Sequence, residues 1–236
     1  MTDPLAGWGE MTAALVFFLA AHIVPARPKL RNWLKAQLGL VLYIGLYSAL
    51  SILLLIWIVI AAGRTPYIEL WPVAQWQYWA PLIAMPLACL LVAYGAAAAN
   101  PFSIGGLGSE QFDPQRPGIA RITRHPLLWA PTLWALAHLF PNGDLAHVIL
   151  FGLLAAFGLI GMYELDRRRQ REWGLSEWRR KAAKTSFIPF MSRDMLDREQ
   201  SLAPSDWVRL AAAAALYLIL LQAHEPVIGL SPIPPM

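Results

Sequence analysis

Six apolar stretches separated by short polar segments set the pattern of this chain. Each stretch approaches the roughly 20 residues that an α-helix needs to cross a hydrocarbon core of about 30 Å. The segments between them are too short to form a separate soluble domain. The pattern therefore predicts an all-α fold, a polytopic bundle of six transmembrane helices that forms a single domain over residues 1–236. The predicted spans are residues 8–26, 37–62, 79–99, 126–141, 145–163 and 207–223.

The positive charges fall on one side of these predicted spans. All 19 Lys and Arg residues except Arg64 lie in or beside the segments that follow the first, third and fifth spans. Short loops rich in Lys and Arg stay in the cytoplasm. We therefore expect a multi-pass protein of the bacterial inner membrane with both termini on the periplasmic side.

The composition is typical of a membrane protein and indicates which classes of partner it contacts. The chain is 57% hydrophobic and 14% charged, whereas soluble domains are about 45–50% apolar and about 25% charged. The net charge of +4 arises in the predicted cytoplasmic loops, which indicates contact with anionic lipid headgroups rather than with nucleic acid. Cys89 is the only cysteine and lies within the third span, so we expect neither an internal disulfide nor a thiolate metal cluster.

Histidines within the apolar spans are the first candidates for function, because ionisable side chains are costly in lipid. His22 lies in the first predicted span and His138 in the fourth, and His125 opens the fourth span at its cytoplasmic end. Neutral imidazole is a common ligand of metals and of haem iron. His147 and His224 lie near span ends, where a hydrogen-bonded interfacial side chain explains them. We therefore take His22 and His138 as the candidate ligands.

The residues around His125 also suit an anion. Pro126 fits the first turn of a helix, because the amide hydrogen that proline lacks would be unpaired there. His125 then lies at a helix N-terminus, among unpaired N–H donors that favour an anion, and Arg121 and Arg124 add positive charge. The motif predicts a carboxylate or phosphate site on the cytoplasmic face, although the basic segments are equally explained as topology anchors that contact lipid.

Several motifs together resemble the NnrU family of bacterial membrane proteins. They are AAHIVPARP, NPFSIGGLG, PQRPGIARITRHPLLWAPTLWALAHL, PNGDLAHVILFG and TSFIPF, and the resemblance covers nearly the whole chain. The family is linked by association with denitrification genes to nitrite and nitric oxide reduction. It is related to plant 15-cis-zeta-carotene isomerase, a haem b enzyme of the same membrane fold. The resemblance implies haem b with His22 and His138 as axial ligands, and it matches His125 to a third family histidine.

A second resemblance competes with the first. An RHP motif that opens a helical hairpin, followed by ELDRRRQREWGLSEW and TSFIP, is similar to the isoprenylcysteine carboxyl methyltransferase superfamily. Those enzymes bind S-adenosylmethionine on the cytoplasmic side of the membrane. The resemblance implies an S-adenosylmethionine site formed by His125, Glu164, Arg168 and Glu172. The two histidines within the spans have no role in that chemistry.

The expected depths of the histidines in the membrane do not decide which two of them are the axial ligands. His22 lies roughly four residues from the cytoplasmic end of its span, or about 6 Å deep at 1.5 Å per residue, whereas His138 lies about 20 Å deep. Axial ligands of one haem need nearly equal depth, so simple straight spans would pair His22 with His125.

Three functions stay open: a haem-dependent isomerase or redox enzyme, a methyltransferase, and a non-catalytic assembly or transport factor. The implied partners are the lipid bilayer and either a lipophilic small-molecule substrate or components of nitrogen-oxide reductases.

Overall fold

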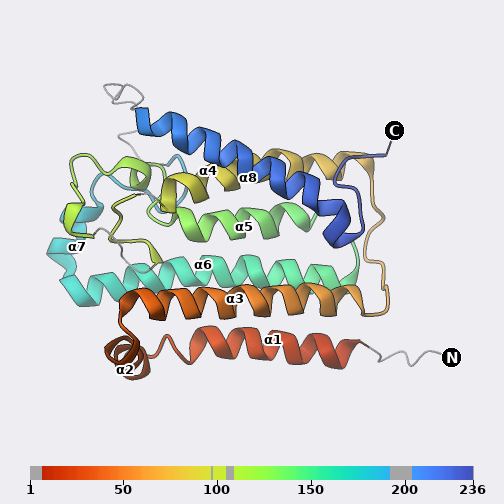
Figure 1. Ribbon diagram of the computed structural model, residues 1–236, viewed down its shortest axis with the longest axis horizontal. Coiled ribbons are helices and arrows are strands. Elements are labelled where there is room, and N and C mark those ends of the chain that lie inside the picture. The colour runs from red at the N-terminus through yellow and green to blue at the C-terminus, as the bar shows by residue number, and fades with distance from the viewer. Residues whose placement is uncertain (1–6, 97, 105–108, 192–203, 236) are drawn as a thin grey trace. The chain divides into compact units, whose positions relative to one another are not determined.

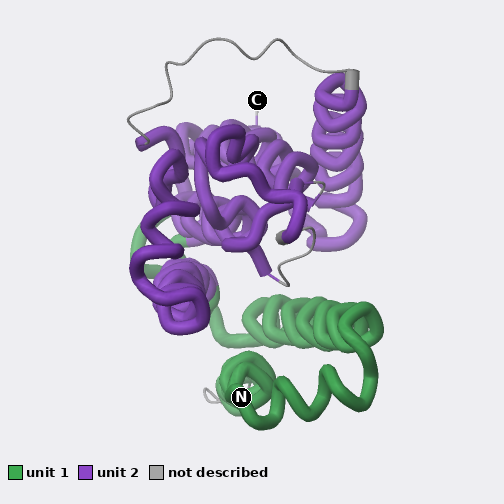
Figure 2. The backbone as a smooth tube through the Cα atoms, turned by 90° about the vertical axis from the view of Figure 1, so that its left-hand side faces the viewer, with its two compact units in different colours: residues 1–72, 143–150 green, residues 73–142, 151–236 purple. Residues whose placement is uncertain are grey.

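The computed structural model describes residues 7–96, 98–104, 109–191 and 204–235. Within these ranges the secondary structure is helical, with one isolated β-bridge between Glu69 and Asp144 and no strand. The chain divides into unit 1, residues 1–72 with 143–150, and unit 2, residues 73–142 with 151–236 (Figure 2). Residues 105–108 of the NPFSIGGLG motif and the basic residues Arg193 and Arg198 lie outside the described ranges.

Unit 1 contains α1 (Trp8–Ile23), α2 (Pro28–Leu38) and α3 (Leu40–Gly63), and α1 packs along α3 (Figure 1). Three buried residues of α1 lie on one helical face, as the spacing of an amphipathic helix requires; they are Met11, Ala14 and Phe18. The chain bends by 78° between α1 and α2. Because Pro28 is at the start of α2, it limits the helical conformation of Arg27 before it, which is extended with φ −60° and ψ 129°.

Unit 2 is built around α4, which contacts both α5 and α8 (Figure 1). Two glycines permit close approach of its helices. A Cβ added to Gly95 of α4 would lie 2.8 Å from Cγ of Pro126, and one added to Gly158 of α6 would collide with Oγ1 of Thr132 in α5. The described helices after unit 1's α3 are η1 (Gln75–Tyr78), α4 (Trp79–Ala96), η3 (Ser109–Gln111), η4 (Gly118–Arg121), α5 (Pro126–His138), α6 (Leu145–Trp173), α7 (Leu175–Ala182) and α8 (Pro204–Ile228); the first six residues of α6 belong to unit 1.

Several of these helices have the length and composition of membrane spans. Four qualify by themselves, in α3, in η1 with α4, in α6 and in α8, and a fifth results if the bent pair α1 and α2 is one span. The 13 residues of α5 extend only about 20 Å at 1.5 Å per residue. The prediction of a multi-pass, all-helical membrane protein is thus confirmed, whereas six spans with periplasmic termini stay a prediction.

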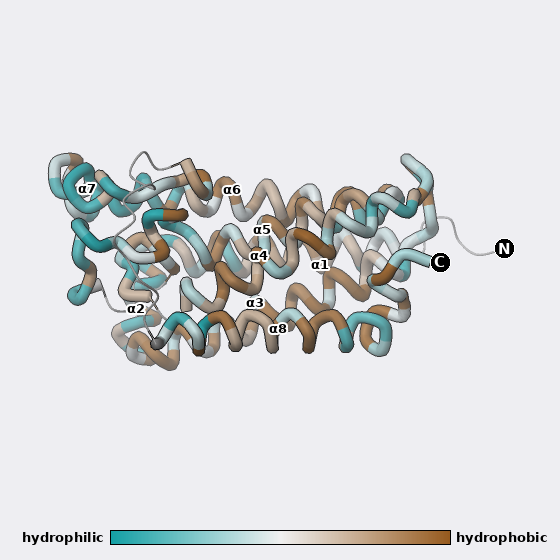
Figure 3. Tube along the Cα trace, turned by 90° about the horizontal axis from the view of Figure 1, so that it is seen from above, coloured by the Kyte–Doolittle hydropathy of each residue, from teal (hydrophilic) through white to brown (hydrophobic). Residues whose placement is uncertain are grey.

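Hydrophilic residues gather on α7 and on the end of α6 that leads to it, whereas α8 is mainly apolar along its middle (Figure 3). The helix of α6 continues to Trp173, ten residues beyond the apolar stretch that ends at residue 163 (173 − 163). Pairs such as Arg168 with Glu172 at i and i+4 support this polar extension. The extension carries charged side chains to the start of α5, where the first candidate site lies.

Candidate functional site

A buried ionic cluster joins the start of α5 to α6 in unit 2. Nε2 of His125 lies 3.0 Å from Oδ1 of Asp166, and Arg124 donates to Oδ2 from Nε at 3.2 Å and from Nη2 at 2.8 Å. His125 is 1% exposed, Asp166 is 6% exposed and Arg124 is 9% exposed. Charges buried to this degree are retained in proteins only when they are paired and hydrogen-bonded.

Backbone and side-chain bonds bring three of the sequence motifs together around this cluster. Asn100 of NPFSIGGLG donates from Nδ2 to the carbonyl of Arg124 at 2.9 Å. The amide of Arg124 donates to the carbonyl of Ser186 in TSFIPF at 2.7 Å, and Trp129 donates from Nε1 to the carbonyl of Phe187 at 2.9 Å. The RHP motif is therefore fixed by hydrogen bonds to the NPFSIGGLG motif and to the TSFIPF motif.

The guanidinium of Arg124 is also surrounded by aromatic rings. Its Cζ lies 5.4 Å from the ring centre of Trp178 and 5.9 Å from those of Phe102 and Phe187. Nη1 completes the set by donating to Oγ1 of Thr185 at 3.2 Å. Cation–π contacts of a desolvated guanidinium add to the stabilisation from its ion pair. Arg124 therefore links α5 to the residues around Phe102, Trp178 and Phe187.

His125 keeps one nitrogen without a partner. The carboxylate of Asp166 can only accept, so Nε2 of His125 carries a hydrogen. Nδ1 is buried and makes no hydrogen bond among the residues that the structure describes. Nδ1 of His125 could therefore make one further hydrogen bond.

Asp166 was missed by the sequence reasoning, which had singled out its neighbours. Its signal is helical periodicity: Ala155, Met162 and Asp166 continue one buried face of α6 at i, i+7 and i+11. Glu164, two residues earlier and hence on a different face, is exposed.

The other residues of the predicted S-adenosylmethionine site lie on the surface of α6. Arg168 donates from Nε to Glu172 at 2.8 Å, and Arg169 donates to the same carboxylate at 2.9 Å. The ring of His125 contacts Asp166 and Phe187, and its backbone amide donates to Oγ1 of Thr123. The structure thus brings His125 together with Asp166 and brings Arg168 together with Glu172.

His22 lies in α1 of unit 1, where it is half-buried. Its Nδ1 lies 2.7 Å from the carbonyl oxygen of Phe18, one turn earlier. Because a carbonyl oxygen only accepts, Nδ1 carries the hydrogen and Nε2 is the basic nitrogen. The ring packs against Phe18 at 4.3 Å and against Tyr47 at 5.6 Å between ring centres.

His138, the last residue of α5 in unit 2, repeats this arrangement. Its Nδ1 lies 2.7 Å from the carbonyl oxygen of Trp134. The rings of Trp134 and Phe151 lie 5.5 Å and 5.4 Å from its ring centre. Asn142 donates from Nδ2 to the carbonyl of His138 at 2.7 Å and so satisfies one of the carbonyls that the helix end leaves unpaired. The basic Nε2 of His138 makes no hydrogen bond within the described part of the chain.

His224 lies near the end of α8, also in unit 2, and its ring centre is 6.5 Å from that of His138. The chain turns after α8 at Gly229, whose φ of +83° suits glycine. This turn brings the carbonyl oxygen of Leu230 to 2.8 Å from Nδ1 of His224.

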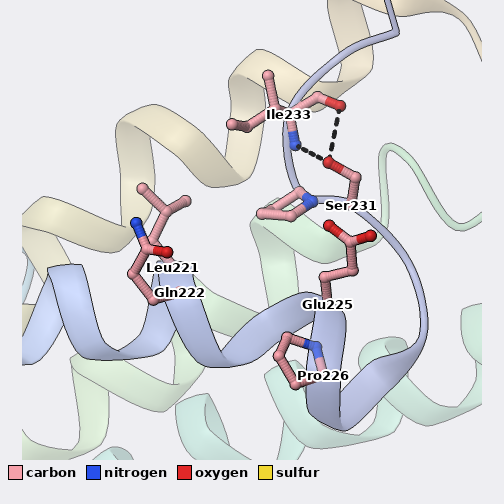
Figure 4. Close-up of a pocket in the computed structure, with 7 residues that line it drawn as sticks. Leu221, Gln222, Glu225, Pro226, Ser231 and Ile233 are labelled. Carbon is pink, nitrogen blue, oxygen red and sulfur yellow. Dashed lines mark hydrogen bonds between the residues drawn. The ribbon is translucent and has the colours of Figure 1, made fainter.

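The same turn forms one wall of a pocket of about 450 Å³ at the end of α8 (Figure 4). Leu221, Gln222 and Glu225 line it from the helix, and Ser231 and Ile233 line it from the turn. The amide of Ile233 donates to Oγ of Ser231 at 3.2 Å, which fixes the turn. Glu225 is the one charged side chain among the residues that line this pocket.

Comparison with known proteins connects these sites to a family. The model of the NnrU protein family matches residues 10–232, a range that includes His22, His125, His138 and His224. No curated protein and no solved structure matches the chain. Because the family match covers nearly the whole chain, the protein belongs to the NnrU family.

Proposed function

We propose that this protein is a haem b-binding membrane protein in which His138 is an axial ligand of the iron. The proposal rests on the hydrogen bond from Nδ1 of His138 to the carbonyl of Trp134. It fixes the tautomer that presents Nε2 as a donor of electrons, and histidines that bind metals usually donate their other N–H to a carbonyl or carboxylate in this way.

The metal-binding side chains among the described residues suit haem iron better than a metal ion that is bound by protein side chains alone. The described residues hold no group of three or more His, Cys, Asp or Glu side chains that could bind a metal ion. Haem iron takes four nitrogens from its porphyrin, so it needs only one or two protein ligands. The rings of Trp134 and Phe151 pack against His138, so the imidazole lies in aromatic surroundings. Bound haem would supply a one-electron redox centre or a Lewis acid at this position.

His22 is the other axial candidate that the family resemblance implies, and its tautomer is fixed in the same way by Phe18. His22 belongs to unit 1 and His138 to unit 2. His125 is the weaker candidate, because its Nε2 is occupied by Asp166 and its Nδ1 lies within the buried cluster.

The family points to two settings for such a haem. One is nitrite and nitric oxide metabolism, with nitrogen-oxide reductase components as partners, and the other is an isomerase-like reaction on a lipophilic substrate in the bilayer. Among the described residues no contact favours the methyltransferase alternative, since Arg168 and Glu172 are paired with each other.

An absorption spectrum of the protein purified from haem-replete cells tests the proposal. We expect a Soret band that is lost or strongly reduced in His138→Ala. His147→Ala is the matched control, because His147 has Nδ1 bonded to Asp144 at 2.8 Å in unit 1 and should leave the spectrum unchanged. A protein without haem under these conditions would refute the proposal.

We also propose that all six apolar stretches cross a bacterial inner membrane with both termini in the periplasm. The support is the restriction of Lys and Arg, apart from Arg64, to alternate loops. Reporter fusions at six positions test this topology, and inverted results at two or more of them would contradict it. We expect cytoplasmic behaviour after Lys35, Arg116 and Arg180, and periplasmic behaviour after Glu69, Gly143 and Met236.

A further inference from the structure

One exposed side of α6 in unit 2 passes from apolar to basic residues along the helix. Leu153, Ile160 and Tyr163 are 43%, 61% and 54% exposed, and Arg167 and Arg171 farther along the helix are exposed as well. With about 3.6 residues per turn, positions 7 or 18 residues apart return to nearly the same side of a helix. Leu153, Ile160, Arg167 and Arg171 therefore form one stripe, which in a membrane contacts lipid.

The two arginines of this stripe differ from their neighbours in their partners. Arg168 and Arg169 both donate to the carboxylate of Glu172, at 2.8 Å and 2.9 Å. Within the part of the chain that the structure describes, neither Arg167 nor Arg171 makes an ion pair or a side-chain hydrogen bond. Both guanidinium groups thus have N–H donors for an acceptor outside the described residues.

The position of Arg167 along α6 matches the depth of lipid phosphates. The apolar stretch ends at residue 163, so Arg167 lies four residues (167 − 163), or about 6 Å at 1.5 Å per residue, beyond it. The headgroup region on each side of a bilayer is about 5–7 Å thick, since a bilayer of about 40–45 Å contains a hydrocarbon core of about 30 Å.

The second arginine can reach the same depth. Arg171 lies one turn beyond Arg167, and long side chains in a helix lean toward its N-terminus, which in α6 is the apolar end. Arg167 shows this direction, because its Cζ lies 5.5 Å from the ring centre of Tyr163, one turn closer to the apolar stretch.

We propose that this stripe is a binding site for an anionic phospholipid in the leaflet at the polar end of α6. Arg167 and Arg171 donate to the phosphate, since residues one turn apart are neighbours on a helix surface and a phosphate accepts from several donors. Ile160 and Leu153 contact the acyl chains. The proposed topology makes this leaflet the cytoplasmic one, whose surface is negatively charged. The site does not depend on bound haem.

Native mass spectrometry of the purified full chain in detergent, titrated with phosphatidylglycerol, tests the proposal. We expect Arg167→Gln/Arg171→Gln to bind this lipid at least about tenfold more weakly, because charge-assisted hydrogen bonds to the phosphate are lost. Arg179→Gln/Arg180→Gln is the matched control, because it removes two exposed charges from α7, and it should weaken binding clearly less. Equal losses in the two variants would indicate diffuse attraction to all basic segments and would overturn the site.

Two further variants separate a lost contact from a lost fold. Arg167→Lys/Arg171→Lys keeps both charges and should retain most of the binding. Glu164→Gln removes an exposed negative charge one turn from these arginines and should strengthen binding. Weaker binding in Glu164→Gln would contradict the proposal.

A competition experiment identifies the source of the phosphate. Millimolar inorganic phosphate should not displace phosphatidylglycerol, because it lacks the acyl chains that contact Ile160. Displacement by inorganic phosphate would assign the two arginines to a free anion and overturn the proposal of a lipid site.

Discussion

Replacing Asp166 by Asn is the most direct test of the buried cluster. The change keeps the size of the side chain but removes the negative charge that Arg124 and His125 share. Arg124 would remain 9% exposed, and within the described part of the chain the other side chain that accepts a hydrogen bond from it is the neutral Thr185. A guanidinium left in this position loses its counter-charge without gaining water.

Breaking a buried ion pair by removing one partner costs about 3–5 kcal/mol. A loss of 1 kcal/mol lowers Tm by about 2–4 °C in chains of 150–250 residues, so we expect a decrease of roughly 6–20 °C. Thermal unfolding in a mild detergent, followed by tryptophan fluorescence, would measure it. The ring of Trp178 contacts Arg124, and Trp129 is hydrogen-bonded to the carbonyl of Phe187 beside the cluster, so both would report its loss.

Glu177→Gln is the matched control, with the same chemical change in α7. Bonds from Arg180 at 2.7 Å and 2.8 Å lower the pKa of Glu177 to about 2. The Arg180 side chain is nevertheless 63% exposed, so water screens the pair and its loss should scarcely change Tm. If Asp166→Asn lowers Tm no more than Glu177→Gln does, the reasoning about burial is wrong.

Two further predictions concern helix packing and the competing cofactor. Gly158→Ala should cost about 1–3 kcal/mol of stability through overpacking, because its Cβ would collide with Thr132, whereas Gly161→Ala has open space around it and should be neutral or slightly stabilising in the same unfolding assay. Equal effects would contradict the close approach of α5 and α6. Calorimetry with S-adenosylmethionine should detect no saturable binding at millimolar cofactor, since Arg168 is paired with Glu172; binding that is lost in Arg168→Ala would favour the methyltransferase.

Hydrophobic runs were sufficient to locate the helices but not their ends. Each of the six apolar stretches contains a helix, yet α6 continues ten residues into the polar sequence and α5 ends three residues before its predicted span does. A helix continues as long as its backbone and side-chain bonds are favourable, and Arg168 with Glu172 supplies one such bond. The short helix α2 was not predicted, since it is mostly polar and was treated as an interfacial charge segment.

The candidate ligands could be predicted from the sequence only where the histidine and the carbonyl that accepts its hydrogen bond lie in one helix. The bonds that fix His22 and His138 join residues four apart, so an apolar helix around a histidine already contains the acceptor carbonyl. His224 takes its carbonyl from Leu230, beyond the end of α8 and through a turn at Gly229. Its proximity to His138 depends on the packing of α4 against both α5 and α8. Hydropathy does not encode that packing, and for this reason an imidazole interpreted as an interfacial side chain is found beside the principal candidate ligand.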